Sequence, residues 1–286
     1  MYKKCLILAL LVPLALLVGC SNETADISLD ELRQKTHIHG LAFDRADSDR
    51  LLVATHHGLH VVDSNRRVRQ ISSESHDFMG FSPHPEEAGL LFASGHPARG
   101  GNLGVMVSAD GGERWEQRSP GADGPVDFHQ MTISEANPDV LYGAYAGKLQ
   151  VSRDGGHAWQ VQADAPPGLI ALAASSREPE HLYAATQNGL LMSPDGGLRW
   201  RLVHPQRDPV SVVLSSGGEL YAFMLGVGLL RAEEAAREWT LVNENWGENY
   251  LMHLAVDPSD PDRLIAADDQ GYLWLSEDAG QHWSAL

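Results

Sequence analysis

One eight-residue pattern, Ser-x-Asp-x-Gly-x-x-Trp, occurs four times in this chain and constrains its fold more than any other feature. The copies begin at Ser108, Ser152, Ser193 and Ser276. Their serines lie 44, 41 and 83 residues apart, and the longest interval holds a degenerate copy over 232–239. A period of about 40 residues is typical of small units that repeat in a stack or a ring. The chain is therefore expected to be a repeat protein.

A second periodic signal gives the secondary structure of each repeat. Two short apolar segments, separated by a turn rich in Pro, Asp or Gly, recur along the chain, and a sixth, more eroded copy of the pattern fits residues 58–63. The paired segments are 41–43 with 51–54, 81 with 90–93, 131–133 with 141–144, 172–174 with 182–185, 212–214 with 220–223, and 254–256 with 264–267. Evenly spaced short strands predict an all-β fold, a six-bladed β-propeller over 37–286.

The repeated phrase resembles the Asp-box, or BNR repeat, of sialidases, sortilin-type receptors and photosystem II assembly factor propellers. In such a box the Ser and Asp side chains cap a tight hairpin, and Gly supplies a positive φ. The Trp is expected to be substantially buried beside the blade and to donate through its ring N–H. Because the box fastens a hairpin, the resemblance implies a fold and leaves the function open.

The N-terminal residues indicate export. Lys3 and Lys4 precede an apolar run that ends at Cys20, so residues 1–19 are interpreted as a lipoprotein signal peptide and Cys20 as the lipidated residue. We expect the protein to be extracytoplasmic and anchored to a bacterial membrane, the outer one if the host has one, because Ser21 follows the cysteine. Residues 20–36 are interpreted as a polar tether with one helical turn, since Ser28 and Glu31 form a capping box.

Composition narrows the classes of function. The chain has two cysteines, and both lie at or before residue 20, so no thiol is left for a disulfide, a thiolate metal site or a nucleophile. The formal net charge of −17 disfavours nucleic acid as a partner, because phosphates require a basic surface. The expected state is a monomer.

Aligning the innermost strands of the six repeats places equivalent residues side by side around the channel. One level of this ring carries His39, Met79, His129 and Met252, from four consecutive repeats, with Ile170 and Ser211 completing it. Imidazole and thioether groups together suit copper, particularly Cu(I). We therefore predict a copper site with His39, Met79, His129 and Met252 as ligands.

The next level towards the mouth adds polar groups that could support this site. It carries Tyr250, His37, Asp77 and Asp127, and the adjoining loops add His56, His57 and His96. His37, Asp77, Asp127, His57 and His96 are assigned to an outer shell that orients the ligands. The predicted function is a non-catalytic, surface-anchored propeller that binds a metal ion or small ligand at its channel mouth.

Two other functions stay open. The segment from His37 to Gly40 and the loop over 95–104 resemble those of bacterial lipoproteins described as glycosyl hydrolases or sialidases. That resemblance implies a glycosidase in which Asp77, Asp127, Tyr250 and Arg99 would act. A sialidase, however, needs three arginines to hold the substrate carboxylate, and Arg99 is the main one placed for it. The third function is a propeller that binds a protein partner, as assembly factors do.

Overall fold

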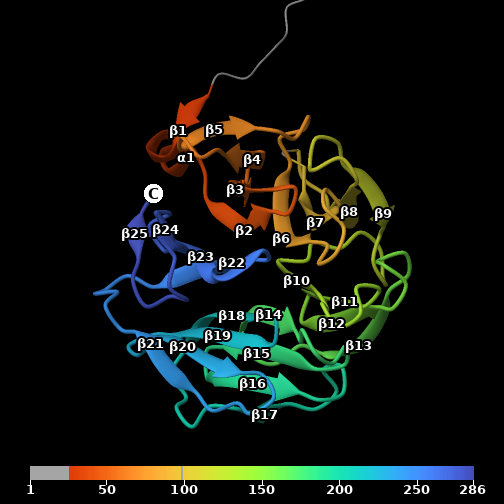
Figure 1. Cartoon of the computed structure of the whole chain (residues 1–286). Helices are drawn as coiled ribbons and strands as arrows, with labels where there is room; N and C mark the ends of the chain where they lie inside the picture. The colour runs from red at the N-terminus through yellow and green to blue at the C-terminus, as the bar shows by residue number, and fades with distance from the viewer. Residues whose placement is uncertain (1–25, 98) are drawn as a thin grey trace, which may run out of the picture.

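A computed structural model describes residues 26–286 of the chain, except residue 98. The described residues form an all-β ring of six sheets with one short helix, which confirms the predicted six-bladed propeller (Figure 1). The expected signal peptide and Cys20 lie outside the described residues. Within the part that is described, no helix has the length and hydropathy needed to span a membrane.

The strands follow one another in chain order from the channel to the rim of each blade. Blade 1 contains β2 (Ile38–Asp44), β3 (Asp47–Thr55), β4 (Gly58–Val62) and β5 (Arg67–Gln70). Blade 2 contains β6 (Asp77–Pro83), β7 (Leu91–His96), β8 (Val105–Ser108) and β9 (Glu116–Ser119). Blade 3 contains β10 (Gln130–Ile133), β11 (Leu141–Tyr145), β12 (Lys148–Ser152) and β13 (Gln160–Asp164). Blade 4 contains β14 (Leu169–Ala174), β15 (Leu182–Thr186), β16 (Gly189–Ser193) and β17 (Arg201–Leu202). Blade 5 contains β18 (Val210–Ser216), β19 (Glu219–Met224), β20 (Gly228–Glu233) and β21 (Thr240–Asn243). Blade 6 contains β22 (Leu251–Asp257), β23 (Asp260–Asp268), β24 (Leu273–Ser276) and β25 (Ser284–Ala285).

The four full Asp-boxes fasten the hairpins between the third and fourth strands, as the sequence predicts. In blade 2, the Ser108 hydroxyl accepts the Gly112 N–H at 2.9 Å, and the Asp110 carboxylate accepts the Arg114 N–H at 2.9 Å. In the degenerate copy of blade 5, the buried carboxylate of Glu234 accepts hydrogen bonds from the hydroxyls of Ser176 and Ser215 instead. An acidic side chain thus still anchors this hairpin, both to β18 of its own blade through Ser215 and to blade 4 through Ser176.

The Asp-box tryptophans are substantially buried, as the sequence pattern predicts. Trp115 is buried, whereas Trp159, Trp200 and Trp283 are half-buried and pack against three of the core clusters. The ring N–H of Trp115 donates to Gly112 O at 3.0 Å, and Trp159 and Trp283 make the equivalent bond within their own boxes. The Trp200 ring N–H is buried without such a partner.

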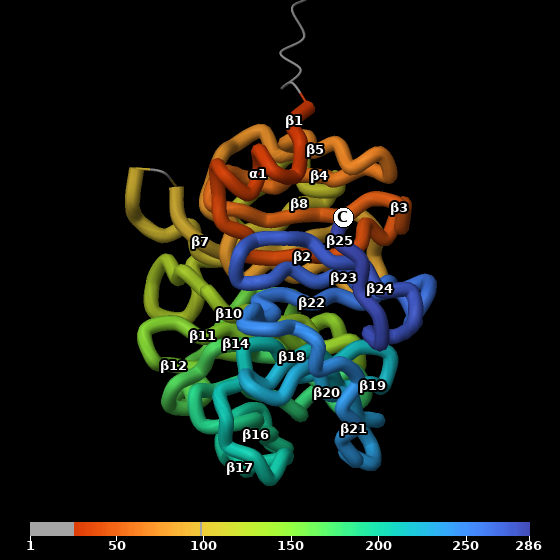
Figure 2. Tube along the Cα trace, turned by 90° about the vertical axis from the view of Figure 1, so that its left-hand side faces the viewer, coloured from red at the N-terminus to blue at the C-terminus, as the bar shows by residue number. Residues whose placement is uncertain are grey.

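Part of the segment expected as a tether belongs to the folded body. β1 (Ile27–Ser28) pairs with β5 and adds a fifth strand to blade 1, and α1 (Leu29–Lys35) follows with the predicted Ser28–Glu31 capping box. Leu32 is buried among residues of blades 1 and 6, together with the C-terminal Leu286. Figures 1 and 2 show α1 beside the C-terminus, at the seam where the ring closes.

Candidate metal centre

A bulge in the innermost strand of four blades determines which side chains face the channel. The pairing register shifts at His39, Ile170, Ser211 and Met252, which occupy the same position in blades 1, 4, 5 and 6. A bulge leaves its extra residue outside the ladder and redirects its side chain. In blade 2 the irregularity falls after Met79, which still pairs with Ser94.

The predicted ring of residues does line one central cavity. His39, Met79, His129, Ile170, Ser211 and Met252 all contribute to the wall of a cavity of about 820 Å³. Met79 is 8% exposed and Met252 is 44% exposed. The shortest contact between ionisable groups in this region nevertheless lies one level further out, at Asp77.

Asp77 lies at the centre of a cluster of imidazoles from blades 1 and 2. Its Oδ2 is 2.5 Å from His56 Nδ1 and 3.3 Å from His96 Nε2, and its Oδ1 is 3.7 Å from His39 Nε2. One ligand atom from each of His39, His56 and Asp77 lies within 4.8 Å of the others. Asp77 itself is only 5% exposed.

The backbone brings these groups together from four segments. Asp77 begins β6 and His96 ends β7, and the two residues pair directly. Gly95 makes this approach possible, because its φ is +120° and a Cβ there would lie 1.9 Å from Asp77 O. His56 lies in the turn between β3 and β4, and the hydrogen bond from Gly58 N to His76 O holds that turn against the start of β6.

Two buried polar atoms of this cluster have no hydrogen-bond partner. They are His39 Nε2 and Asp77 Oδ1, and they face each other across 3.7 Å. Leaving a buried polar atom unpartnered costs about 1–3 kcal/mol. Burial also lowers the pKa of His39 to about 4, with the nearby Asp77 opposing the shift, so its imidazole is neutral at pH 7. A neutral imidazole facing a carboxylate is suited to bind a cation.

The other predicted site residues differ in their contacts with this cluster. The His37 and His57 rings lie 5.5 and 6.4 Å from the His56 ring. His129 Nε2 lies 3.2 Å from Asp127 Oδ2, and this hydrogen bond raises the pKa of His129. Arg99 is exposed in the loop after β7.

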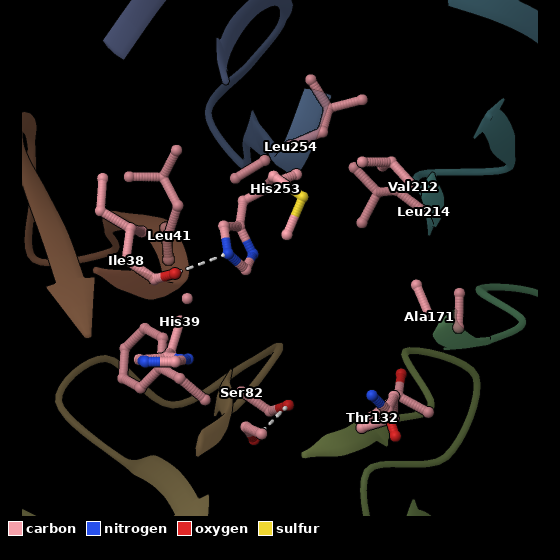
Figure 3. A pocket seen from close by; sticks show the side chains of 18 of the residues that line it. Ile38, His39, Leu41, Ser82, Thr132, Ala171, Val212, Leu214, His253 and Leu254 are labelled. Carbon is pink, nitrogen blue, oxygen red and sulfur yellow. Dashed lines mark hydrogen bonds between the residues drawn. The ribbon is translucent and has the colours of Figure 1, made fainter. Parts of the chain in front are cut away.

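Tyr250 and His253 come from blade 6 and the turn before it, and they have different surroundings. Tyr250 is half-buried in the core between blades 5 and 6, and its N–H donates to the Asp269 carboxylate at 3.1 Å. Sequence reasoning missed His253, which lines the cavity with its Nε2 3.0 Å from Ile38 O (Figure 3). Simple alternation along β22 would direct Met252 and His253 to opposite faces. Because of the bulge at Met252, both side chains line the cavity. A bulge cannot be recognised in a single sequence, so His253 was not predicted.

Comparison with known proteins agrees with the fold. No protein-family profile and no curated protein sequence matches this chain. Among solved structures, the GH74 xyloglucanase from Xanthomonas campestris superposes with a TM-score of 0.61 at 20% identity, over 88% of this chain and 45% of that one. The GH74 enzyme from Niastella koreensis gives 0.63 at 17% identity, over 87% and 45%. YCF48 from Cyanidioschyzon merolae gives 0.53 at 16% identity, over 88% and 85%.

These similarities agree with the fold that the strand order shows. The described residues form a six-bladed β-propeller, and its structural neighbours include GH74 enzymes and YCF48. The chain spans less than half the length of the GH74 proteins that it matches. At these identities the likeness is one of fold.

Proposed function

We propose that this protein is a non-catalytic propeller that binds a transition-metal ion, preferably copper, at the mouth of its channel. In this proposal His39, His56 and Asp77 are the ligands and His96 is a fourth. The observation that carries the proposal is the pair of buried, unpartnered atoms, His39 Nε2 and Asp77 Oδ1. An ion between them would give both a partner.

The spacing of the donor atoms supports this proposal. Bonds of about 2.0–2.2 Å separate neighbouring donor atoms by about 3.3–3.6 Å at tetrahedral angles, and by about 2.8–3.1 Å at the right angles of the square-planar geometry that Cu²⁺ prefers. The 3.7 Å between His39 Nε2 and Asp77 Oδ1 and the 3.3 Å between His96 Nε2 and Asp77 Oδ2 are close to the tetrahedral spacing, so these side chains would move closer together to bind Cu²⁺. The 2.5 Å contact between His56 and Asp77 is that of a hydrogen bond, and it would lengthen when both groups bind the same ion.

The donor set favours copper among the common ions. Imidazole with carboxylate suits Cu²⁺ and Zn²⁺, and for divalent ions Cu²⁺ gives the tighter complex. The thioethers of Met79 and Met252 line the cavity that His39 also lines, and thioethers suit Cu(I). The predicted ligand set of His39, Met79, His129 and Met252 is thus replaced in this proposal by one centred on Asp77, with the thioethers nearby.

Calorimetric titration of the purified, metal-free propeller with Cu²⁺ tests this proposal. We expect one ion per chain, and we expect His39→Ala and Asp77→Asn each to weaken binding by at least about 100-fold, the upper end of the loss caused by changing a residue that only supports a ligand. His282→Ala is the matched control, because His282 is 88% exposed in the Asp-box of blade 6. Equal binding by the wild type and both site variants would refute the site.

A glycosidase is the second candidate, and the GH74 neighbours are the observation that favours it. Asp77 and Asp127 would then be the pair of carboxyl groups that glycoside hydrolysis requires. Incubation of metal-free protein with xyloglucan and aryl glycosides tests it. Turnover that disappears in both Asp77→Asn and Asp127→Asn would favour the enzyme over the binding protein.

We also propose that the protein is held at a bacterial membrane by a lipid on Cys20. The basic residues, apolar run and cysteine at the N-terminus support this proposal. Cells that express the full chain should incorporate labelled palmitate into it, and Cys20→Ala should abolish the labelling. Labelling that persists in Cys20→Ala would exclude this anchor.

A further inference from the structure

The cavity beside the candidate metal centre has one side of mixed polarity and one mainly aliphatic side. Its volume of about 820 Å³ is within the range of pockets that hold small organic ligands. His39, Ser82 and Thr132 lie on one side, where Leu41 is next to His39. Ala171, Val212, Leu214 and Leu254 lie on the other side, where His253 is next to Leu254 (Figure 3). One metal ion would occupy only a small part of this space.

The proposed ligands all come from blades 1 and 2, so the protein surrounds the ion from one side. His39 belongs both to this ligand set and to the wall of the cavity. The aliphatic side is contributed by blades 4, 5 and 6, across the channel. A coordination position that the protein leaves open on that side would be filled from within the cavity.

A buried hydroxyl on the aliphatic side provides an independent indication of a ligand. Ser211 is 6% exposed, lines the cavity, and its Oγ has no hydrogen-bond partner. Its neighbours in the strand, Val210 and Val212, are buried hydrophobic residues. A polar atom of a bound molecule would satisfy this hydroxyl once the Ser211 side chain rotates its Oγ towards the cavity, and the metal ion at Asp77 does not explain the missing partner.

We propose that the cavity binds a small organic molecule that coordinates the metal ion through a donor group and packs an apolar body against the aliphatic side. This inference rests on the proposed metal centre. The ligand class is a nitrogen or oxygen donor with an attached ring or short hydrocarbon, and a polar atom within reach of Ser211. The ion would then be bound as part of a complex with this molecule.

Two probes that differ only in their apolar body test the inference. Copper-loaded protein is titrated with imidazole and with 4-phenylimidazole, and binding is followed by calorimetry and by the visible absorption of Cu²⁺. Burying a phenyl ring against aliphatic side chains should make 4-phenylimidazole bind about 10- to 100-fold more tightly than imidazole. The copper content after gel filtration verifies that neither probe removes the ion.

Two variants on the aliphatic side test where in the cavity the phenyl group of 4-phenylimidazole binds. Ala171→Phe should fill the cavity and Leu214→Asn should make its wall polar, and both should reduce the preference for 4-phenylimidazole to less than about threefold. Neither residue belongs to the proposed ligands, so Cu²⁺ alone should bind as it does to the wild type.

The outcomes separate this inference from the metal centre itself. If Cu²⁺ binds but the two probes bind equally tightly, the organic site is refuted and the metal centre stands. A preference that persists in both variants places the phenyl group elsewhere and also refutes the inference. If the wild type does not bind Cu²⁺, the proposed function fails, and this inference fails with it.

Discussion

At the scale of single residues, buried histidines link the stability of this propeller to pH. His60 in β4 is 7% exposed, and burial lowers its pKa to about 4. In the unfolded chain its pKa would be about 6.5. The unfolded state therefore binds a proton more readily, and this contribution to stability is present above pH 6.5 and is lost as the pH falls towards 4.

This difference leads to a prediction for His60→Leu. The wild type should lose free energy of unfolding by up to about 1.4 kcal/mol per pH unit from this group between pH 6.5 and 4. His60→Leu should lose less stability over this pH range. Some loss should remain in this variant, because burial also lowers the pKa of His39 to about 4. Urea unfolding of the metal-free proteins at several pH values measures the free energy of unfolding of the wild type and of His60→Leu. Identical pH dependence in the two proteins would refute the assignment.

At the scale of secondary structure elements, β1 and α1 close the ring. Every blade is built from consecutive strands, so no strand is exchanged between the first and last blades among the described residues. The seam is held instead by side chains. Arg263 of blade 6 donates to Ser48 O of blade 1 at 2.7 Å, and Arg33 of α1 lies 4.2 Å from the centre of the Tyr272 ring.

Leu32 tests the contribution of α1 to this seam. Its side chain is 3% exposed in a core shared by blades 1 and 6, so Leu32→Ala should cost about 2–5 kcal/mol of stability. Leu29→Ala, at the half-buried start of the helix, should cost less. Thermal unfolding monitored by circular dichroism compares them. Equal effects, or none, would show that α1 does not hold the seam.

The whole molecule shows which parts of a repeat protein can be predicted from sequence. The Asp-boxes and paired apolar segments predict the six blades, because both are local patterns that recur in each repeat. The predicted start of the propeller at His37 is too late, because β1 and α1 have few apolar residues to indicate that they are folded. The burial of Leu32 depends on packing in one core cluster with Ile265 and Leu273, near the other end of the chain.

The candidate site was predictable only in part, for a similar reason. Alignment of the repeats predicts which residues face the channel, and His39, Met79, His129 and Met252 do so. The cluster around Asp77 depends on the approach of the turn at His56 to the start of β6. That approach is set by packing between blades 1 and 2, so it cannot be predicted from the sequence of either segment alone.

Anomalous diffraction at the copper absorption edge, from crystals grown with one equivalent of Cu²⁺, is the most direct test of the proposed metal centre. We expect one strong peak within about 2.0–2.3 Å of His39 Nε2 and a carboxylate oxygen of Asp77. We also expect the peak to be absent from crystals of Asp77→Asn. A peak at any other position, or no peak in the wild type, would refute the proposed metal centre.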